Sequence, residues 1–569
     1  MNKKNKLKKV LKTLTIIVLS LILLVIVSIS LGIVITNKPQ MQQISYEPVN
    51  LDYWPAQEWQ IATPEEQGMD SAKLLEMVEF YEEERSENEK ISIDFITIVR
   101  NGYIVADIYL NPFFPKDTKH IIHSCTKSIM SALIGIAIEE GYIQGVDVLV
   151  LDILDDKNIE NVDARMKTLT LKNLLTMQTG LHSQDSYLYR WKGLFRMQAT
   201  ADWTEYILNL PIEAEPGTRF DYSNMASFLL SAIITKTTGN DTLSFARKHL
   251  FDPLEIKDIQ WEKSPQGIDI GWARMWLKPH DMAKIGLLYL QKGKWANQQI
   301  IPTQWVEESI TAHSFPKKYR YVYNEEGKVD RMASGGLWMF TNLARPFADG
   351  YGYQWWLDES NMYSAVGNGG QYIMVVPKEN LVVVFTSKLS GADSFLPAKM
   401  LDKYILPAIV ANESITANVT AQNELSLLSE PPRQAVKPKP VPELPAIAQE
   451  VSEETYSLDS NPWKYNNFKL IFDPEKDYAE FSYTAKENDV VNYEVGLDNV
   501  YRLTESNGDT YAAVGSWTTP DTFVIDYELV GYSTRGKWIF TFDNEGIAVK
   551  EVGVTGVYDY GGKKTITRD

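Results

Sequence analysis

Residues 123–138 read HSCTKSIMSALIGIAI, in which Ser124 stands three positions before Lys127 and an apolar run follows. Positions i and i+3 lie on one face of a helix, so we expect the Lys127 amine to approach the Ser124 hydroxyl. The run after Lys127 is apolar on every side, which predicts a buried helix. A serine–lysine pair at the start of a buried helix is typical of an activated nucleophile.

Two further segments place polar residues where they can join such a pair. Tyr222-Ser223-Asn224 directly precedes an apolar, helix-like run that extends to about Thr237. Gly367-Asn368-Gly369-Gly370 forms a glycine-rich turn between two strand-like runs. Each short pattern alone is weakly specific, and Tyr465-Asn466-Asn467 repeats the spacing of the first. Their order and context are informative, and we expect the three segments to converge on one cleft.

Strand-like runs lie at both ends of a long, mainly helical region. Ser92–Arg100 and Tyr103–Leu110 flank Asn101-Gly102, which is a strong hairpin signal. Further runs follow far downstream, at 363–366, 371–376 and 381–387. The early hairpin must pair with these late strands to form one antiparallel sheet, which predicts an α+β domain.

The chain changes character after this domain. Residues 411–450 contain six prolines and scattered charges, which predicts an extended linker because proline lacks a backbone donor. Residues 451–569 consist of short strand-like runs separated by turn residues, which predicts a small all-β barrel or sandwich. The partner of this β domain is unknown from the sequence. A lid, a wall-binding module and a dimer contact all remain open.

The N-terminus predicts a membrane anchor. Lysines are concentrated in the first twelve residues, and Thr13 to Thr36 is uncharged and mostly apolar. At ~1.5 Å per residue this run exceeds the ~30 Å hydrocarbon core. The lysines mark the cytoplasmic side, so the rest of the chain is expected outside the cell, held by a single pass through the membrane. A cleaved signal peptide is the alternative.

The resulting domain prediction comprises a cytoplasmic basic segment (1–12), a transmembrane signal anchor (13–36), a stalk (37–62), an α+β domain (63–410), a Pro-rich linker (411–450) and an all-β domain (451–569). The formal net charge of −18 argues against a nucleic-acid partner.

The three segments resemble the motifs of the serine β-lactamase and penicillin-binding protein superfamily, most closely its class C-like esterase and amide-hydrolase branch. The S-x-x-K motif matches Ser124–Lys127, the Y-x-N motif matches Tyr222–Asn224, and the glycine-containing third motif matches Asn368–Gly370. The resemblance covers about residues 60–410. It implies a β-lactamase-like α+β fold, in which helices flank an antiparallel sheet and form a helical subdomain.

The resemblance also implies roles for these residues. Ser124 would be the nucleophile, with Lys127 and Tyr222 as general base and acid. Lys127 can accept a proton only if burial and nearby positive charge lower its pKa from ~10.4. Backbone N–H groups of Ser124 and Gln371 would form the oxyanion hole. Cys125, the sole cysteine, is expected to be a small buried hydrophobe.

Substrate-binding positions follow from the same resemblance. Asn224 would orient a substrate amide or the lysine, although a helix N-cap is the alternative for this residue. Gly369 and Gly370 would let a substrate carbonyl approach. Asn368 stands where the superfamily usually has lysine or histidine, so a cation that would hold a substrate carboxylate is missing. This departure favours a neutral ester or amide over penicillin.

Three functions are therefore considered. The first is an extracytoplasmic serine hydrolase that cleaves a small-molecule or peptide-like ester or amide. The second is a penicillin-binding-type D-Ala carboxypeptidase, a peptidase or a β-lactamase on the same fold. The third is a non-catalytic cell-surface binding protein. No metal or other cofactor is expected, because the chain has only six histidines and the pair His120 and His123 has no matching carboxylate cluster in the sequence.

Overall fold

The computed structural model describes residues 44–565 except 52, 56–57, 161–162, 186–190, 317–320, 324–328, 333–349, 359, 432–436, 485–488, 544–545 and 554–555. The described residues from Tyr46 onward belong to one compact unit. The predicted anchor at 13–36 lies outside the described residues and stays a prediction. Within the described part of the chain, no helix is both long and apolar enough to cross a membrane.

The first domain is built on an antiparallel sheet with the strand order β10-β11-β12-β13-β14-β1-β2. Its strands are β10 (Gly350–Tyr351), β11 (Trp356–Leu357), β12 (Tyr363–Gly367), β13 (Gln371–Val376), β14 (Leu381–Ser387), β1 (Ile93–Arg100) and β2 (Tyr103–Tyr109). Strand β1 pairs with β14, with Ile98 opposite Val383. The predicted pairing of the early hairpin with the late strands is therefore confirmed.

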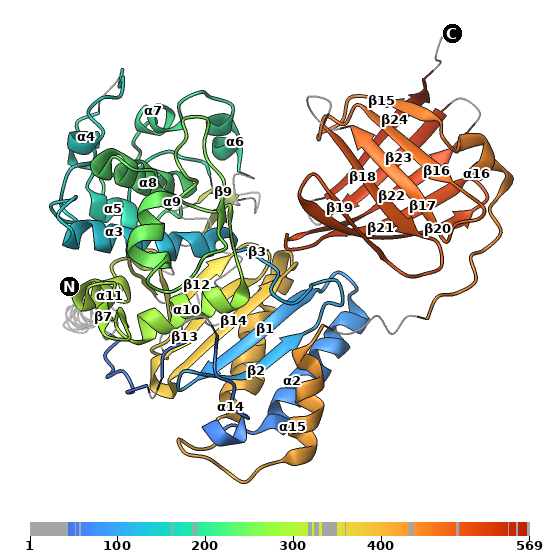
Figure 1. Ribbon diagram of the computed structural model, residues 1–569. Helices are drawn as coiled ribbons and strands as arrows, with labels where there is room; N and C mark the ends of the chain where they lie inside the picture. Colours follow the sequence, from blue (N-terminus) through green and yellow to red (C-terminus); the bar gives the residue numbers. More distant parts are fainter. Residues whose placement is uncertain are drawn as a thin grey trace, which may run out of the picture. The chain divides into compact units, whose positions relative to one another are not determined.

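The hairpin between β1 and β2 shows why this register forms. Arg100 pairs with Tyr103, so only Asn101 and Gly102 connect the two strands. Both have positive φ, 54° and 87°, as a tight turn of the favoured hand requires. Every residue of β1 is buried. Helix α10 (Pro279–Leu290) packs on β1, β13 and β14, as Figure 1 shows, which explains part of this burial.

Helices form the rest of the first domain. The longer ones are α2 (Ser71–Glu87), α3 (Thr126–Glu139), α6 (Lys192–Gln198), α7 (Trp203–Leu208), α8 (Asn224–Thr238), α10 and α11 (Thr303–Ser309). Shorter ones are η1 (Glu65–Gln67), η2 (His123–Cys125), α4 (Val150–Ile153), η3 (Met166–Thr168), α5 (Leu171–Leu175), α9 (Thr242–Ala246), η5 (Arg247–Phe251), η8 (Pro377–Glu379), η9 (Gly391–Phe395), α13 (Leu396–Met400), η10 (Leu401–Ile405) and α14 (Leu406–Ala408). Helix α3 is buried from Thr126 to Ala137 and packs against α8 and α11, as its apolar sequence predicts.

Short strands complete this domain. They are β3 (His120–Ile121), β4 (Gln260–Trp261), β5 (Met275–Leu277), β6 (Lys294–Trp295), β7 (Gln298–Gln299), β8 (Tyr321–Tyr323) and β9 (Val329–Met332). Strand β5 lies between β3 and β4. Because β3 leads directly into η2, this small sheet holds the chain just before the predicted nucleophile.

The C-terminal domain is a closed β-barrel. Its strands are β15 (Thr455–Leu458), β16 (Asn467–Phe472), β17 (Tyr478–Thr484), β18 (Val490–Gly496), β19 (Arg502–Ser506), β20 (Asp509–Thr519), β21 (Thr522–Leu529), β22 (Thr534–Phe542), β23 (Gly546–Gly553) and β24 (Gly556–Lys564). A pairing of Gly496 in β18 with Val514 in β20 closes the ring. Aromatic side chains such as Phe468, Phe481 and Trp538 fill its core. The predicted small β domain is confirmed as a barrel.

The predicted linker at 411–450 is not extended throughout, which corrects that expectation. Helix α15 (Val419–Ser426) and the turn η11 (Leu427–Ser429) lie within it, and α15 packs on α2 and β2. Helix α16 (Ala446–Val451) ends the segment and packs on β16. The prolines lie outside α15 itself, so they do not prevent this helix.

Candidate active site

Ser124 lies in the turn η2, directly before helix α3 and next to the sheet. The turn packs on β12 and β13, which places the serine between the helical part of the domain and the sheet. Lys127 follows in the first turn of α3, and its Nζ lies 3.1 Å from Oγ of Ser124. The structure thus brings the two residues into hydrogen-bonding distance, as their spacing predicts.

Lys127 is held in an environment that favours the neutral amine. Its side chain is 1% exposed, and burial lowers the pKa of the amine to about 7, although the Asp185 carboxylate opposes this effect. Nζ donates to Oδ1 of Asn224 at 2.8 Å and to the carbonyl of Trp272 at 3.0 Å. A neutral amine has two N–H bonds and one lone pair. In the neutral form these two acceptors leave the lone pair for the Ser124 hydroxyl, whereas in the protonated form Nζ also donates to Oγ of Ser124.

Tyr222 lies beside this pair. Its ring centroid is 4.9 Å from Nζ of Lys127, and the ring stacks on Trp356 with a centroid distance of 5.7 Å. Burial raises the pKa of the Tyr222 hydroxyl, whereas its hydrogen bond with Ser124 opposes that rise. The hydroxyl is therefore protonated at neutral pH and stands where a proton can pass to or from the serine oxygen.

Asn224 is oriented by a residue that sequence reasoning missed. Its Nδ2 donates to the backbone carbonyl of Asp185 at 3.0 Å, which turns Oδ1 towards Lys127. Asn224 is the first residue of α8, whereas the N-cap is Ser223, whose hydroxyl accepts from the backbone N–H of Ala226. The alternative of Asn224 as the helix N-cap was therefore wrong.

Asp185 is held beside the N-terminus of α8 by hydrogen bonds to its carboxylate. Its carboxylate accepts from the hydroxyls of Ser183 (2.8 Å) and Ser223 (3.1 Å) and from the backbone N–H of Met225 (2.7 Å). Burial raises the pKa of the Asp185 carboxyl, and these hydrogen bonds at the N-terminus of α8 oppose the rise. In the sequence Asp185 stands in an ordinary loop, so no local pattern distinguished it.

The glycine-rich turn, Gly367–Gly370, lies against η2, the nucleophile turn that contains Ser124. A side chain at Gly367 would come within 2.4 Å of the Ile122 carbonyl, so only glycine permits this close approach. The Cys125 thiol, which is buried as expected, donates to the Gln371 carbonyl at 3.5 Å. The backbones of Ser124 and Gln371, predicted to form the oxyanion hole, are thus in neighbouring segments that pack together.

The predicted substrate-binding residues of the turn differ in exposure. Asn368 is exposed at the tip of the turn, whereas Gly369 and Gly370 are buried. Both glycines have positive φ, 81° and 82°, which other residues rarely adopt. The Ser387 hydroxyl lies 2.9 and 2.6 Å from their carbonyls and fixes the turn to the end of β14.

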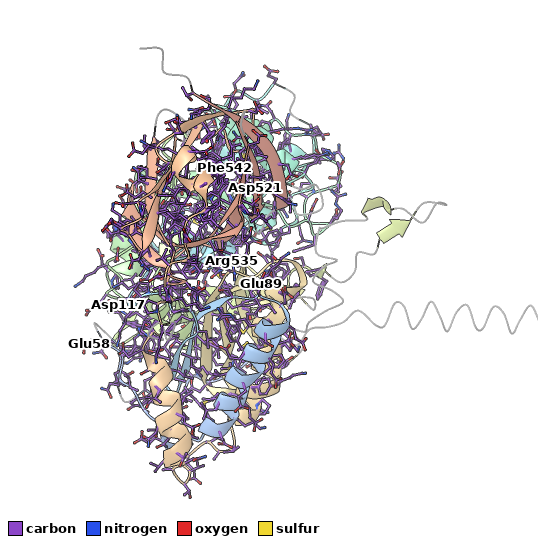
Figure 2. All side chains as sticks on the ribbon, turned by 90° about the vertical axis from the view of Figure 1, so that its right-hand side faces the viewer. Glu58, Glu89, Asp117, Asp521, Arg535 and Phe542 are labelled. Atoms are coloured by element: carbon purple, nitrogen blue, oxygen red, sulfur yellow. The ribbon has the colours of Figure 1, made fainter. Side chains whose placement is uncertain are left out.

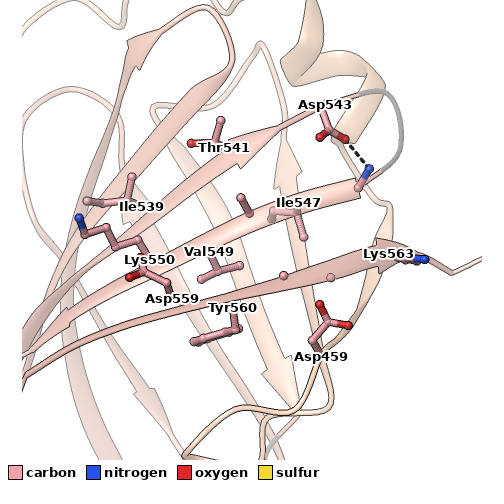
Figure 3. A pocket seen from close by; sticks show the side chains of 14 residues that line it. Asp459, Ile539, Thr541, Asp543, Ile547, Val549, Lys550, Asp559, Tyr560 and Lys563 are labelled. Carbon is pink, nitrogen blue, oxygen red and sulfur yellow. Dashed lines mark hydrogen bonds between the residues drawn. The ribbon is translucent and has the colours of Figure 1, made fainter.

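A separate groove of about 600 Å³ lies on the barrel, along β22, β23 and β24. Figure 3 shows its lining, which includes Ile539, Lys550 and Asp559. None of the predicted site residues borders it. Within the described ranges, no group of three histidine, cysteine, aspartate or glutamate side chains is arranged to hold a metal ion.

Comparison with known proteins gives a family match and a relative of known name. The family described as Beta-lactamase matches residues 80–404. A 6-aminohexanoate-dimer hydrolase from Paenarthrobacter ureafaciens is 21% identical over 327 residues, which are 54% of this chain and 75% of that protein.

Two solved structures are similar to the chain at lower sequence identity than this relative. EstCE1, a hydrolase with promiscuous acyltransferase activity, is 14% identical with a TM-score of 0.46, covering 60% of this chain and 99% of that one. An octameric penicillin-binding protein homologue from Pyrococcus abyssi is 16% identical with a TM-score of 0.42, covering 85% of this chain and 99% of that one. The family match spans more than half of the sequence, and the chain belongs to the β-lactamase family.

Proposed function

We propose that this protein is a serine hydrolase that cleaves an ester or an amide through an acyl-enzyme on Ser124. The observation that carries the proposal is the environment of Lys127. Its Nζ is 3.1 Å from Oγ of Ser124, and its other hydrogen-bonding directions are taken by Asn224 and by the Trp272 carbonyl. A buried amine whose pKa is near 7 can act as a base at neutral pH.

The proposed reaction has two halves. Lys127 accepts the Ser124 proton while Oγ bonds to the substrate carbonyl carbon, and backbone N–H groups of Ser124 and Gln371 stabilise the oxyanion. Tyr222 donates its proton to the leaving alkoxide or amine as the carbonyl–leaving-group bond breaks, and Lys127 returns a proton to Tyr222. Water then attacks the acyl-enzyme while the same groups accept its proton and restore the Ser124 hydroxyl.

The substrate is proposed to be a neutral, small-molecule or peptide-like ester or amide. Asn368 is exposed at the tip of the third motif and carries no charge for a substrate carboxylate. The relative from Paenarthrobacter ureafaciens is named for hydrolysis of a dimer of 6-aminohexanoate, which suits an amide as the bond that is cleaved. Such a dimer ends in a carboxylate, so this relative supports the amide and not the neutral charge. A D-Ala carboxypeptidase, peptidase or β-lactamase activity is the second candidate, because it uses the same Ser–Lys–Tyr set.

The proposed location is the outer side of the cell membrane, with a single N-terminal pass. This part of the proposal rests on the lysine-rich first twelve residues and on the apolar run from Thr13 to Thr36. A non-catalytic binding protein is disfavoured, because a receptor has no need for a buried lysine directed at a serine hydroxyl.

One experiment tests the proposal. The protein is treated in parallel with a fluorophosphonate probe and with a labelled penicillin, and Ser124→Ala and Cys125→Ala are compared with the wild type. We expect the fluorophosphonate to label the wild type and Cys125→Ala, and Ser124→Ala to take no label. Labelling that survives in Ser124→Ala would refute the assigned nucleophile. Rapid labelling by penicillin would favour the second candidate over the first.

A further inference from the structure

The barrel reaches the candidate active site through the turn between β21 and β22, residues 530–533. The backbone N–H of Ile121 donates to the carbonyl of Gly531 at 2.8 Å, so this turn lies beside β3. The Tyr532 ring meets Trp276 of β5 edge-to-face at a centroid distance of 5.3 Å. A side chain at Gly531 would come within 2.4 Å of the Lys119 carbonyl, which indicates close packing.

Ser533, the last residue of this turn, contacts His123 in the nucleophile turn and Gln371 directly after the glycine-rich turn. Its Oγ lies 3.1 Å from Nε2 of His123, the residue directly before the nucleophile. Nε2 of Gln371 donates to the same Oγ at 3.2 Å. Its Oγ would also lie 2.6 Å from any side chain placed at Gly369. Ser533 therefore links the nucleophile turn to the glycine-rich turn.

The polarity of these hydrogen bonds is consistent. Burial, with a contribution from Arg274, lowers the pKa of His123 to about 3, so its ring is neutral at physiological pH. A neutral ring nitrogen can accept a hydrogen bond from the Ser533 hydroxyl, while the same Oγ accepts a hydrogen bond from Nε2 of Gln371. Gln371 also donates to the Ser387 carbonyl at 2.6 Å, so its side chain is fixed from two sides.

His123 needs such support. Its φ is +46°, in the left-handed region that a residue other than glycine occupies at a cost. The residue that follows is the proposed nucleophile, so a shift of the His123 backbone would move Ser124. Gln371 supplies the other proposed oxyanion donor, and a misplacement of ~1 Å in such a group can cost ~100-fold in rate.

The barrel is docked firmly enough to hold Ser533 in place. Glu528 of β21 is 7% exposed, and its Oε1 accepts from Nδ2 of Asn111 at 2.5 Å and from Nζ of Lys388 at 3.0 Å. Val530 and Ala512 of the barrel share a buried apolar cluster with residues of β1 and β2. An exposed ion pair of 3.4 Å between Lys537 and Glu89 adds to this contact, and Glu89 is labelled in Figure 2.

We propose that the barrel is a working part of the active site and that Ser533 is a positioning residue, which holds His123 and Gln371 so that both oxyanion N–H groups face one point. This inference rests on the proposed function for its effect on rate. The contact itself does not depend on that function. The C-terminal domain thereby has a role in the active site of its own chain.

The test compares Ser533→Ala and Ser533→Thr with Ser516→Ala in the full chain. Ser516 is exposed on β20 and serves as the matched control within the barrel. Turnover of p-nitrophenyl acetate gives kcat and KM, and hydrogen exchange followed by mass spectrometry reports on residues 367–371 without any reaction. We expect Ser533→Ala to lower kcat about 10-fold with little change in KM, because a loosened oxyanion hole weakens transition-state binding.

The exchange of residues 367–371 should become faster in Ser533→Ala and stay unchanged in Ser516→Ala. Ser533→Thr keeps the hydroxyl and should restore both readouts. If Ser533→Ala matches the wild type in kcat and in exchange, the inference is wrong. If the wild type shows no turnover while exchange still responds to Ser533→Ala, the proposed function fails and the contact between barrel and site is supported.

Discussion

Lys127 illustrates at the scale of one residue how burial lowers the pKa of an amine. An amine in water is protonated at neutral pH, but Lys127 is 1% exposed within an apolar helix, and burial lowers its pKa to about 7. Two carbonyl oxygens orient its protons, and the serine oxygen lies in the remaining direction. The same burial that stabilises the helix therefore gives Lys127 the lowered pKa that the proposed mechanism needs.

The pH dependence of acylation follows from this pKa. Only the neutral amine accepts the Ser124 proton, so the rate should fall as pH drops below about 7, by about 10-fold between pH 8 and pH 6. The rate constant for fluorophosphonate labelling, measured from pH 5 to pH 9, checks this. Burial also raises the pKa of Asp221 to about 7, so Asp221→Asn is the control and should keep the midpoint. A flat profile would exclude Lys127 as the base.

Asp185→Asn should shift this profile. The carboxylate raises the pKa of Lys127, so removing its charge should move the midpoint of the rate profile to lower pH. The variant also loses an acceptor at the N-terminus of α8, which costs about 1–3 kcal/mol of stability. Asp202→Asn is the matched control, since Asp202 caps α7 and does not contribute to the pKa shift of Lys127. Asparagine caps a helix about as well as aspartate, so this variant should keep both the stability and the midpoint. Equal midpoints in both variants would contradict the role of Asp185.

At the scale of elements, helix α3 depends on a close contact with α11. A Cβ at Gly135 would come within 2.4 Å of the Trp305 ring. Gly135→Ala should therefore lower the free energy of unfolding by about 1–3 kcal/mol, although alanine favours a helix in general. Denaturant unfolding measures the change. Gly553→Ala meets nothing within 4 Å and should be neutral, and equal stability of both variants would refute the packing argument.

The elements themselves were largely predictable from the sequence. The hairpin at Asn101-Gly102, the buried helix after Lys127 and the strands on either side of Gly367–Gly370 all carry local signals, and the structure contains them. Helix α15 was missed because the prolines around it suggested an extended linker. Its placement depends on packing against α2 and β2, which no local pattern reveals.

At the scale of the whole molecule, a buried ion network joins the barrel to the sheet. Lys388 and Asp94 are fully buried, with Nζ 2.5 and 2.6 Å from the two carboxylate oxygens, and Nζ is 3.0 Å from Oε1 of Glu528. Burial would raise the pKa of Asp94, but Lys388 and His120 outweigh it and lower the pKa to about 2. This contribution to stability is present above pH ~4, near the unfolded pKa. It is lost as pH falls through 2.

Lys388→Met should leave the buried carboxylates of Asp94 and Glu528 without the ammonium that joins them. At pH 7 the cost is about 3–5 kcal/mol, and the melting temperature should fall accordingly. Without the Lys388 ammonium the pKa of Asp94 rises, so part of the loss should be recovered at pH 5, where the Asp94 carboxylate takes up a proton. Lys476→Met removes an exposed pair with Glu480 and should change little. A melting temperature for Lys388→Met equal to that of the wild type would mean that the network does not hold the domains.

The sequence alone determined the pairing of Ser124 with Lys127 and the elements around it, because helical spacing and strand alternation are local. It also placed Tyr222 and Asn224 at the start of a buried helix. Tertiary structure alone decided that Asp185 orients Asn224, and that Ser533, 162 residues from Gln371 in the chain, meets the same site. The first contact forms when the helical part of the first domain packs, and the second forms when the barrel packs on that domain. Their partners leave no mark in the sequence, because any loop serine or aspartate carries the same local pattern.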